Sequence, residues 1–203
     1  GKCCSSHIMS VLNTGLAKTS AGGYDIDNSL RFNDDDSAYL SRTPSVTGNR
    51  KVWTWSGWFK RGNLGTAQYI FSCTSQSGND GIAAIYINTD NTIHTYFDTS
   101  GTNPAGSVNP RVFRDTSAWY HIIWAVDAAN TTQRIWINGS ELSLDSSKNP
   151  PNYDYAMNRS GYVMKMGLMA WDTTLYTDGY LAEVHFIDGQ ALDPTSFGET
   201  GTY

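Results

Sequence analysis

The chain has 203 residues, of which 16% are charged, and a formal net charge of -5. Nucleic acid is not expected as a partner, because phosphate binding needs Lys and Arg massed on one face and the 14 present are scattered. No apolar run approaches the roughly 20 residues that cross a bilayer, so we expect no membrane insertion. The length fits one β-sandwich, and the richness in Gly, Tyr and Trp suits strands joined by polar turns better than helices.

Two short segments are expected to precede the folded domain. Residues 1–9 have the character of an expression leader derived from a vector. Residues 10–27 are small and polar without a sustained period, which predicts a flexible arm that can dock on a partner. Cys3 and Cys4 are adjacent and Cys73 is far away, so we expect neither a disulfide framework nor a zinc site. One domain is predicted over residues 28–203.

The first two strands are predicted at residues 29–33 and 38–41, where apolar residues alternate with polar ones. The acidic triplet Asp34, Asp35 and Asp36 lies between them and supplies turn chemistry. We therefore expect the two strands to pair with each other across this turn.

The clearest strand is predicted over residues 52–60. Its period of two places Trp53, Trp55, Gly57 and Phe59 on one face, which we expect to be the core face. A glycine inside a strand leaves space and marks a close approach, so Gly57 is expected to admit a large ring from the opposing sheet.

Further strands follow in chain order, and two of them form a hairpin around a polar loop. The run at 119–127 is almost continuously apolar, which predicts a central strand covered on both faces. A polar loop is expected from 99 to 110, and Asp193 before Pro194 predicts an N-cap and one short helical turn. The remaining strands are predicted at residues 69–73, 82–87, 92–97, 133–138, 141–144, 162–166 and 179–187.

Several stretches, taken in order, resemble the laminin G-like and concanavalin A-like jelly roll. They are SLRF at 29–32 with DSAYL at 36–40, WTWSGWFK at 53–60, WYHII at 119–123, IWING at 135–139 and GYLAEV at 179–184. The resemblance covers about residues 28–199 and implies an all-β, two-sheet antiparallel jelly-roll sandwich. The sequences of residues 32–44 and 180–194 are also similar to those of this domain in structural proteins of marine tailed phages, such as tail fibres.

Calcium is the one cofactor that the resemblance implies. Laminin G-like modules that bind it use an acidic residue just before the strand that opens the central hairpin, and another in a later loop. Asp80 matches the first position, and Asp154 or Asn158 matches the second. Oxygen ligands from two loops suit Ca²⁺. The alternative is that Asp80 is a turn residue beside a glycine, and the acidic triplet is a turn because its side chains alternate in direction.

Carbohydrate is the second candidate ligand, because sugar rings stack on aromatic faces while polar groups fix their hydroxyls. Strand periodicity explains the loop aromatics Trp171, Tyr176, Tyr153 and Tyr155 least well. The alternative for Trp171 is that its ring packs over the edge of the core and does not stack on a sugar. The tryptophans expected in the core are Trp53, Trp55, Trp119, Trp124 and Trp136.

Catalysis is not expected. The sandwich glycanases of this superfamily place alternating carboxylates on one strand, and no Glu-x-Asp-x-Glu stretch exists here. Glu183 and His185 alternate on the last strand, but a lone Glu beside a His is insufficient. The four histidines are scattered, so the sequence assembles neither a Ser-His-Asp arrangement nor a zinc cluster.

The resemblance to phage structural proteins implies a non-enzymatic module on the exposed, extracellular surface of a virion. Its expected role is recognition of a host-surface glycan or receptor, made useful by repetition on one particle. The alternative is an architectural protein of a capsid or tail, assembled with other virion proteins or as a homo-oligomer such as a trimer through its arm or a sheet edge.

Overall fold

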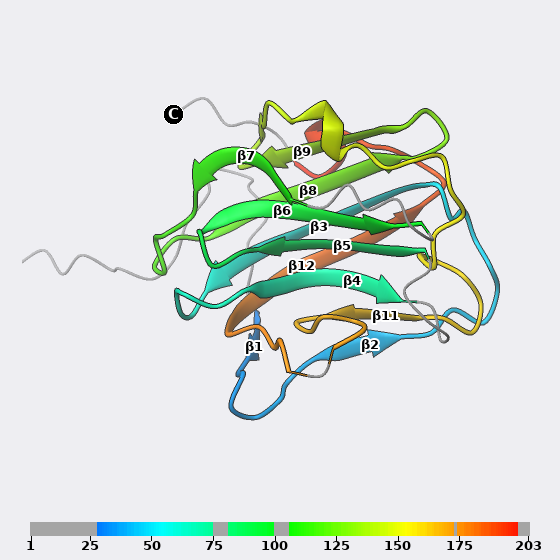
Figure 1. Ribbon diagram of the computed structural model, residues 1–203. Helices are drawn as coiled ribbons and strands as arrows, with labels where there is room; N and C mark the ends of the chain where they lie inside the picture. The colour runs from blue at the N-terminus through cyan, green and yellow to red at the C-terminus, as the bar shows by residue number, and fades with distance from the viewer. Residues whose placement is uncertain (1–27, 75–80, 100–105, 173, 199–203) are drawn as a thin grey trace, which may run out of the picture.

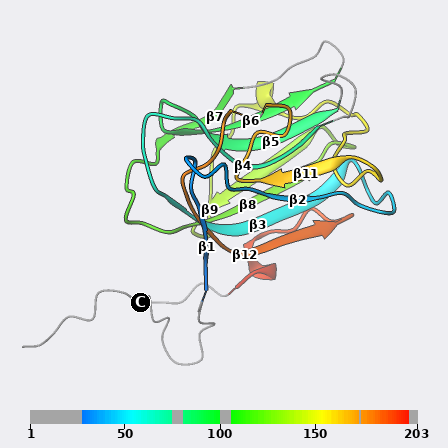
Figure 2. The same cartoon turned by 90° about the horizontal axis from the view of Figure 1, so that it is seen from below.

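The computed structural model describes residues 28–74, 81–99, 106–172 and 174–198. Over these residues two six-stranded antiparallel sheets pack face to face (Figure 1). Sheet A has the order β1-β12-β3-β8-β9-β10, and sheet B has the order β2-β11-β4-β5-β6-β7. Seen from below, β2 and β11 lie above β3 and β12, so that the two layers are separate along this edge (Figure 2). The predicted fold class is confirmed.

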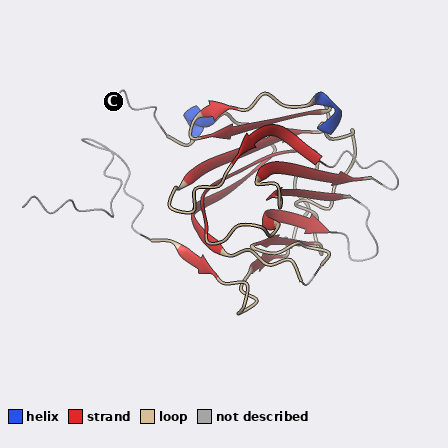
Figure 3. Ribbon diagram, turned by 60° about the vertical axis from the view of Figure 1, so that its left-hand side comes forward, coloured by secondary structure: helices blue, strands red, loops and turns tan. Residues whose placement is uncertain are grey.

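The strands agree with most of the predicted ranges, and two short 3-10 helices lie at the rim of the sandwich (Figure 3). Within the part of the chain that the structure describes, no helix is suited to crossing a membrane. The elements are β1 (Leu30–Phe32), β2 (Leu40–Arg42), β3 (Val52–Arg61), β4 (Gln68–Thr74), β5 (Ile82–Ile87), β6 (Thr92–Asp98), β7 (Gly106–Val112), β8 (Tyr120–Asp127), β9 (Thr132–Ile137), β10 (Ser140–Glu141), η1 (Ser146–Lys148), β11 (Val163–Met166), β12 (Gly179–Asp188) and η2 (Pro194–Ser196).

Three of the predictions about strands are wrong. The strand predicted at 141–144 forms only at its first residue, because β10 is Ser140–Glu141. The first two strands do not pair with each other: β1 pairs with β12 in sheet A, and β2 pairs with β11 in sheet B. Their alternating pattern fixes which residues share a face but carries no information on the partner strand. The loop predicted from 99 to 110 also contains the start of β7, whose Pro110 is tolerated because β7 is the edge strand of sheet B.

The core face of β3 is the one predicted from its period of two. Trp53, Trp55 and Phe59 have no exposed surface. The Trp53 ring stands edge-on to Trp124 of β8, with centroids 4.6 Å apart. The Trp55 ring stacks on Phe71 of sheet B at 6.0 Å, so that aromatic contacts join the two sheets. Burying side chains of this size dominates the energetics of such a core.

The space left by Gly57 is filled differently from the prediction. A Cβ atom on Gly57 would lie 2.9 Å from the Trp55 ring and 3.2 Å from Val184. The ring over this glycine therefore comes from two residues earlier in the same strand and not from the opposing sheet.

The strand β8 is covered on both faces, as its apolar run predicts. Ile123 and Ala125 lie on its outer face and are buried under Trp136 and Phe197. The segment after β12 crosses this face, held by Thr54, whose hydroxyl donates to the Gln190 carbonyl at 2.7 Å. Trp136 is thus buried outside the main core.

The short helical turn expected near the C-terminus is confirmed. Asp193 accepts a hydrogen bond from the Thr195 N–H at 3.0 Å and caps η2, with Pro194 at its first position.

Trp119 lies just before β8 and is only half-buried, so its predicted place in the core is wrong.

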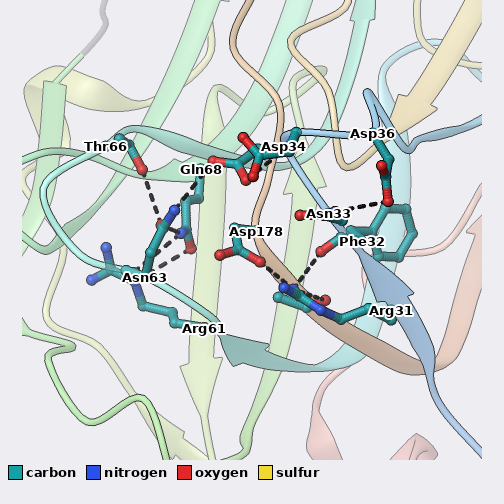
Figure 4. Close-up of polar contacts among 12 residues, drawn as sticks. Arg31, Phe32, Asn33, Asp34, Asp36, Arg61, Asn63, Thr66, Gln68 and Asp178 are labelled. Carbon is teal, nitrogen blue, oxygen red and sulfur yellow. Dashed lines mark hydrogen bonds and ion pairs between the residues drawn. The ribbon is translucent and has the colours of Figure 1, made fainter.

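A buried arginine closes one end of the sandwich. Arg61 is 1% exposed and donates to the Phe113 carbonyl at 2.6 Å and to Asn91 Oδ1 at 2.9 Å. Its Nε donates to Gln68 of sheet B at 3.3 Å (Figure 4). Burial lowers the pKa of the guanidinium, and these bonds are what keep a charge stable between the sheets.

The packing around Gly57 gives the first prediction. Gly57→Ala places a methyl group against the Trp55 ring, so we expect the free energy of unfolding to fall by about 1–3 kcal/mol. Urea denaturation followed by tryptophan fluorescence measures it. Gly198→Ala is the matched control, because a Cβ atom there meets no heavy atom within 4 Å. Equal stability of the two variants would contradict the packing described here.

Candidate functional site

Four aromatic rings gather on the outer face of sheet B. They are Tyr69 of β4, Tyr86 of β5, Tyr96 of β6 and Trp171 from the loop after β11, and we call them the sheet B aromatic surface. The Tyr69 and Tyr86 rings stack at 4.5 Å. Trp171 stacks on Tyr96 at 5.2 Å and meets Tyr69 edge-on at 5.8 Å. Both geometries are favourable for aromatic pairs.

The strand period puts these tyrosines outside. In β5, Ala83, Ile85 and Ile87 face the main core, so Tyr86 between them faces outward. The same alternation was readable in the sequence at Tyr96. It carried little weight there, because an aromatic in a strand is more often a core residue.

Only part of this surface meets solvent. Tyr69 and Tyr86 are 5% and 9% exposed, and burial raises the pKa of both hydroxyls. Tyr96 and Trp171 are half-buried. The accessible portion is therefore the stacked Tyr96–Trp171 pair.

Carboxylates border that pair. The Tyr96 hydroxyl donates to Asp98 Oδ2 at 3.2 Å. Asp172 follows Trp171 in the chain, and its Oδ1 accepts from the Thr174 N–H at 2.7 Å, which shapes the loop that carries the tryptophan. An aromatic face with acceptors at its side is thus built on a rigid sheet.

The four loop aromatics predicted as ligand contacts do not form one group. Trp171 belongs to the sheet B aromatic surface, and Tyr176 lies in the same loop with its ring 6.3 Å from Tyr39. Tyr153 packs against the main core. Tyr155 has no exposed surface, and its hydroxyl donates to the Pro151 carbonyl at 3.1 Å. Tyr155 is a core residue, so its expected role in stacking a ligand is wrong.

The two loops predicted to hold calcium do meet. The Ala156 N–H donates to the Gly81 carbonyl at 2.7 Å. Asp80 lies outside the described residues. The Asp154 carboxylate is exposed and lies 4.0 Å from Arg50 Nη1 and 3.7 Å from Lys51 Nζ, and two such cations disfavour a metal ion.

Asn158, the other residue predicted for the second position, is mostly buried. It is 8% exposed, and its Nδ2 is buried without a hydrogen-bond partner. Among the described residues no three His, Cys, Asp or Glu side chains are grouped to hold a metal. Asp154 and Asn158 thus give no support for calcium, which stays a prediction resting on Asp80.

The acidic triplet is a turn, as its residue order predicts. The Ser37 N–H donates to the Asp34 carbonyl at 3.1 Å. The side chains separate: Asp34 accepts from Asn63 at 3.2 Å, whereas Asp36 accepts from Asn33 at 2.7 Å (Figure 4).

The sequence profile of the concanavalin A-like lectin/glucanases superfamily matches residues 32–196. The chain belongs to this superfamily. No curated protein sequence matches the chain. Its resemblance to laminin G-like domains is therefore confirmed at the level of the superfamily.

Solved structures share the fold of this superfamily member. Laminin α1 domains LG4-5 of mouse are 14% identical with a TM-score of 0.61, over 88% of this chain and 46% of that one. Domain 4 of the arabinanase AbnA of Geobacillus stearothermophilus, in complex with arabinotriose, is 18% identical with a TM-score of 0.55, over 77% and 69%. The sialidase CBM40 of Ruminococcus gnavus, bound to α2,3 sialyllactose, is 15% identical with a TM-score of 0.50, over 77% and 95%.

The cations beside Asp154 give a prediction for this superfamily member. Because that carboxylate already faces Arg50 and Lys51, Asp154→Ala should leave the effect of calcium on the melting temperature unchanged. Differential scanning fluorimetry in calcium chloride and in EDTA measures the effect in the natural chain and in the variant. Asp80→Ala is the comparison variant. Calcium bound only by the folded state must raise stability, so if Asp80 is a ligand, this variant should lose the effect of calcium. A calcium response lost on Asp154→Ala would show that this residue is a ligand.

Proposed function

We propose that this domain is a non-enzymatic glycan-binding module and that the Tyr96–Trp171 pair contacts the sugar. The observation that carries the proposal is a stacked aromatic pair left half-exposed on the outer face of a sheet. The apolar face of a pyranose packs on such rings, while neighbouring carboxylates accept its hydroxyl protons. Asp98 and Asp172 supply these acceptors.

Two of the structures with this fold hold glycans: the arabinanase domain is in complex with arabinotriose and the CBM40 is bound to sialyllactose. At sequence identities of 18% and 15%, these structures are evidence for the fold only. The choice of the aromatic surface therefore rests on the contacts in this chain. The proposal concerns glycan binding by this domain, and it applies equally if the domain is one part of a longer protein.

The electrostatics support binding over hydrolysis. A glycanase needs a carboxylic acid with a raised pKa beside a second carboxylate. Among the described residues, each carboxyl group whose pKa departs from its ordinary value is shifted downward. One example is Glu141, whose hydrogen bond from Arg134 at 2.7 Å lowers its pKa.

We further propose an exposed virion position, on a tail fibre or a similar appendage that contacts a host-surface glycan or receptor. The support is the similarity of residues 32–44 and 180–194 to phage structural proteins. Repetition on one particle would multiply the avidity of individually weak sugar sites.

An architectural role is the second candidate, and one observation favours it. The edge strand β2 of sheet B is exposed at all three residues. Its first residue, Leu40, is 42% exposed, and Tyr39 just before the strand is 44% exposed. An exposed edge with apolar side chains can pair with another chain.

The glycan proposal predicts that Trp171→Ala weakens binding at least tenfold, or about 1.4 kcal/mol, because the stacking face is lost. A glycan array followed by calorimetry on the strongest ligand measures it. Trp119→Ala is the matched control, since that half-buried indole lies outside the sheet B aromatic surface. Release of new reducing ends would contradict the non-enzymatic role.

The architectural candidate has its own outcome. A protein that binds no glycan on the array, yet forms larger assemblies in sedimentation velocity that Leu40→Lys disrupts, would favour assembly through β2 over glycan recognition.

A further inference from the structure

A pocket of about 470 Å³ lies on the outer face of sheet A. Trp58 of β3, His121 of β8 and two residues of β12, Glu183 and His185, contribute to it. Phe197 from the segment after β12 completes one wall. The pocket is thus built on three neighbouring central strands, on the side of the sandwich away from the sheet B aromatic surface.

A β-bulge brings the carboxylate into this pocket. Along β12, Ala182 pairs with Trp58 and His185 pairs with Ser56, so that one residue is extra on the β12 side. In a regular ladder the residue after Ala182 would face Gly57 and point into the core. Val184 takes that inward position instead, because a Cβ atom added to Gly57 would lie 3.2 Å from the Val184 side chain.

The bulge carries backbone strain. Glu183 has a φ of +47°. A left-handed conformation at a residue other than glycine is strained and is found preferentially at functional sites. The result here is a carboxylate on the outer face, 30% exposed and 3.9 Å from the His185 ring nitrogen.

The remaining groups give the pocket an apolar frame with acceptors. The Trp58 ring stacks on His121 at 4.9 Å, and His121 Nε2 lies 2.9 Å from Ser56 Oγ. Phe197 lies 6.5 Å from the His121 ring and 6.4 Å from the His185 ring. Burial, with a smaller effect of His185, lowers the pKa of His121.

Two other uses of the pocket fail on geometry. Ser56 has no exposed surface, so its hydroxyl cannot serve as a nucleophile despite the nearby imidazole. The two histidines and Glu183 do not form a metal cluster, since the described residues contain none.

We propose that this pocket binds a neutral saccharide ring and is a second glycan site, on the sheet opposite the Tyr96–Trp171 pair. The ring packs against Trp58 and Phe197, which both line the pocket, and its hydroxyls donate to the Glu183 carboxylate. An acidic sugar is disfavoured, because its carboxylate would meet that of Glu183. The proposal extends the proposed function: with sites on both outer faces, one domain can bridge two glycan chains.

The test follows the imidazole Cε1–H signals of His121 and His185 by NMR. The natural chain is titrated with methyl glycosides of glucose, galactose, mannose and N-acetylglucosamine, and with glucuronate. We expect at least one neutral glycoside to shift both signals with saturation, and to bind at least tenfold more tightly than glucuronate. If no neutral glycoside shifts them, or if glucuronate binds as tightly, the proposal is overturned.

Variants separate this site from the first one. Glu183→Gln should weaken the binding seen at the histidine signals at least tenfold, whereas Glu141→Gln and Trp171→Ala, at residues that do not line the pocket, should leave it unchanged. If Glu183→Gln unfolds the protein, Trp58→Ala takes its place. Loss of the histidine shifts on Trp171→Ala would mean one site only, on sheet B. Shifts that persist while Trp171→Ala has no effect on array binding would retain this pocket and reject the first site.

Discussion

The interlocking of aromatic rings between the two sheets is the interaction on which the rest of the structure depends. Trp53 stands edge-on to Trp124 within sheet A, and Trp55 reaches across to stack on Phe71 of sheet B. These rings are fully or almost fully buried. Because they fill the space between the layers, each sheet is rigid and its outer face remains available for other contacts.

The two outer faces are finished in different ways. On sheet B, four aromatic rings form a surface of which the Tyr96–Trp171 pair reaches solvent. On sheet A, the segment after β12 covers part of the face through Phe197 and leaves a pocket beside it. The strained Glu183 belongs to this second face. Both faces therefore join apolar rings to carboxylates, which is the chemistry of carbohydrate recognition.

Much of this could be predicted from the sequence, because it depends on local periodicity. The alternation in β3 identified Trp53, Trp55 and Phe59 as core residues, and Asp193 before Pro194 identified η2. The hairpin of β5 and β6 was predicted, but the partners of β1 and β2 could not be, since a pattern of faces does not specify which edge a strand joins. The bulge at Glu183 was equally out of reach, because it follows from the register of β12 against β3. Of the loop aromatics, Trp171 lies on the sheet B aromatic surface and Tyr155 lies in the core, a difference the sequence could not show because a loop residue has no period that indicates its burial.

Trp53, Trp55 and Trp124 lie in the buried interior, whereas Trp171 and Trp58 are half-buried on the two outer faces. ¹⁹F NMR of the protein labelled with 5-fluorotryptophan resolves the seven indoles individually. A glycan that binds the protein should shift the signals of Trp171 and Trp58, and a soluble paramagnetic quencher should broaden them. Both additions should leave the signals of Trp53, Trp55 and Trp124 unchanged. Broadening of those three signals by the quencher, with Trp171 protected in the free protein, would contradict the account.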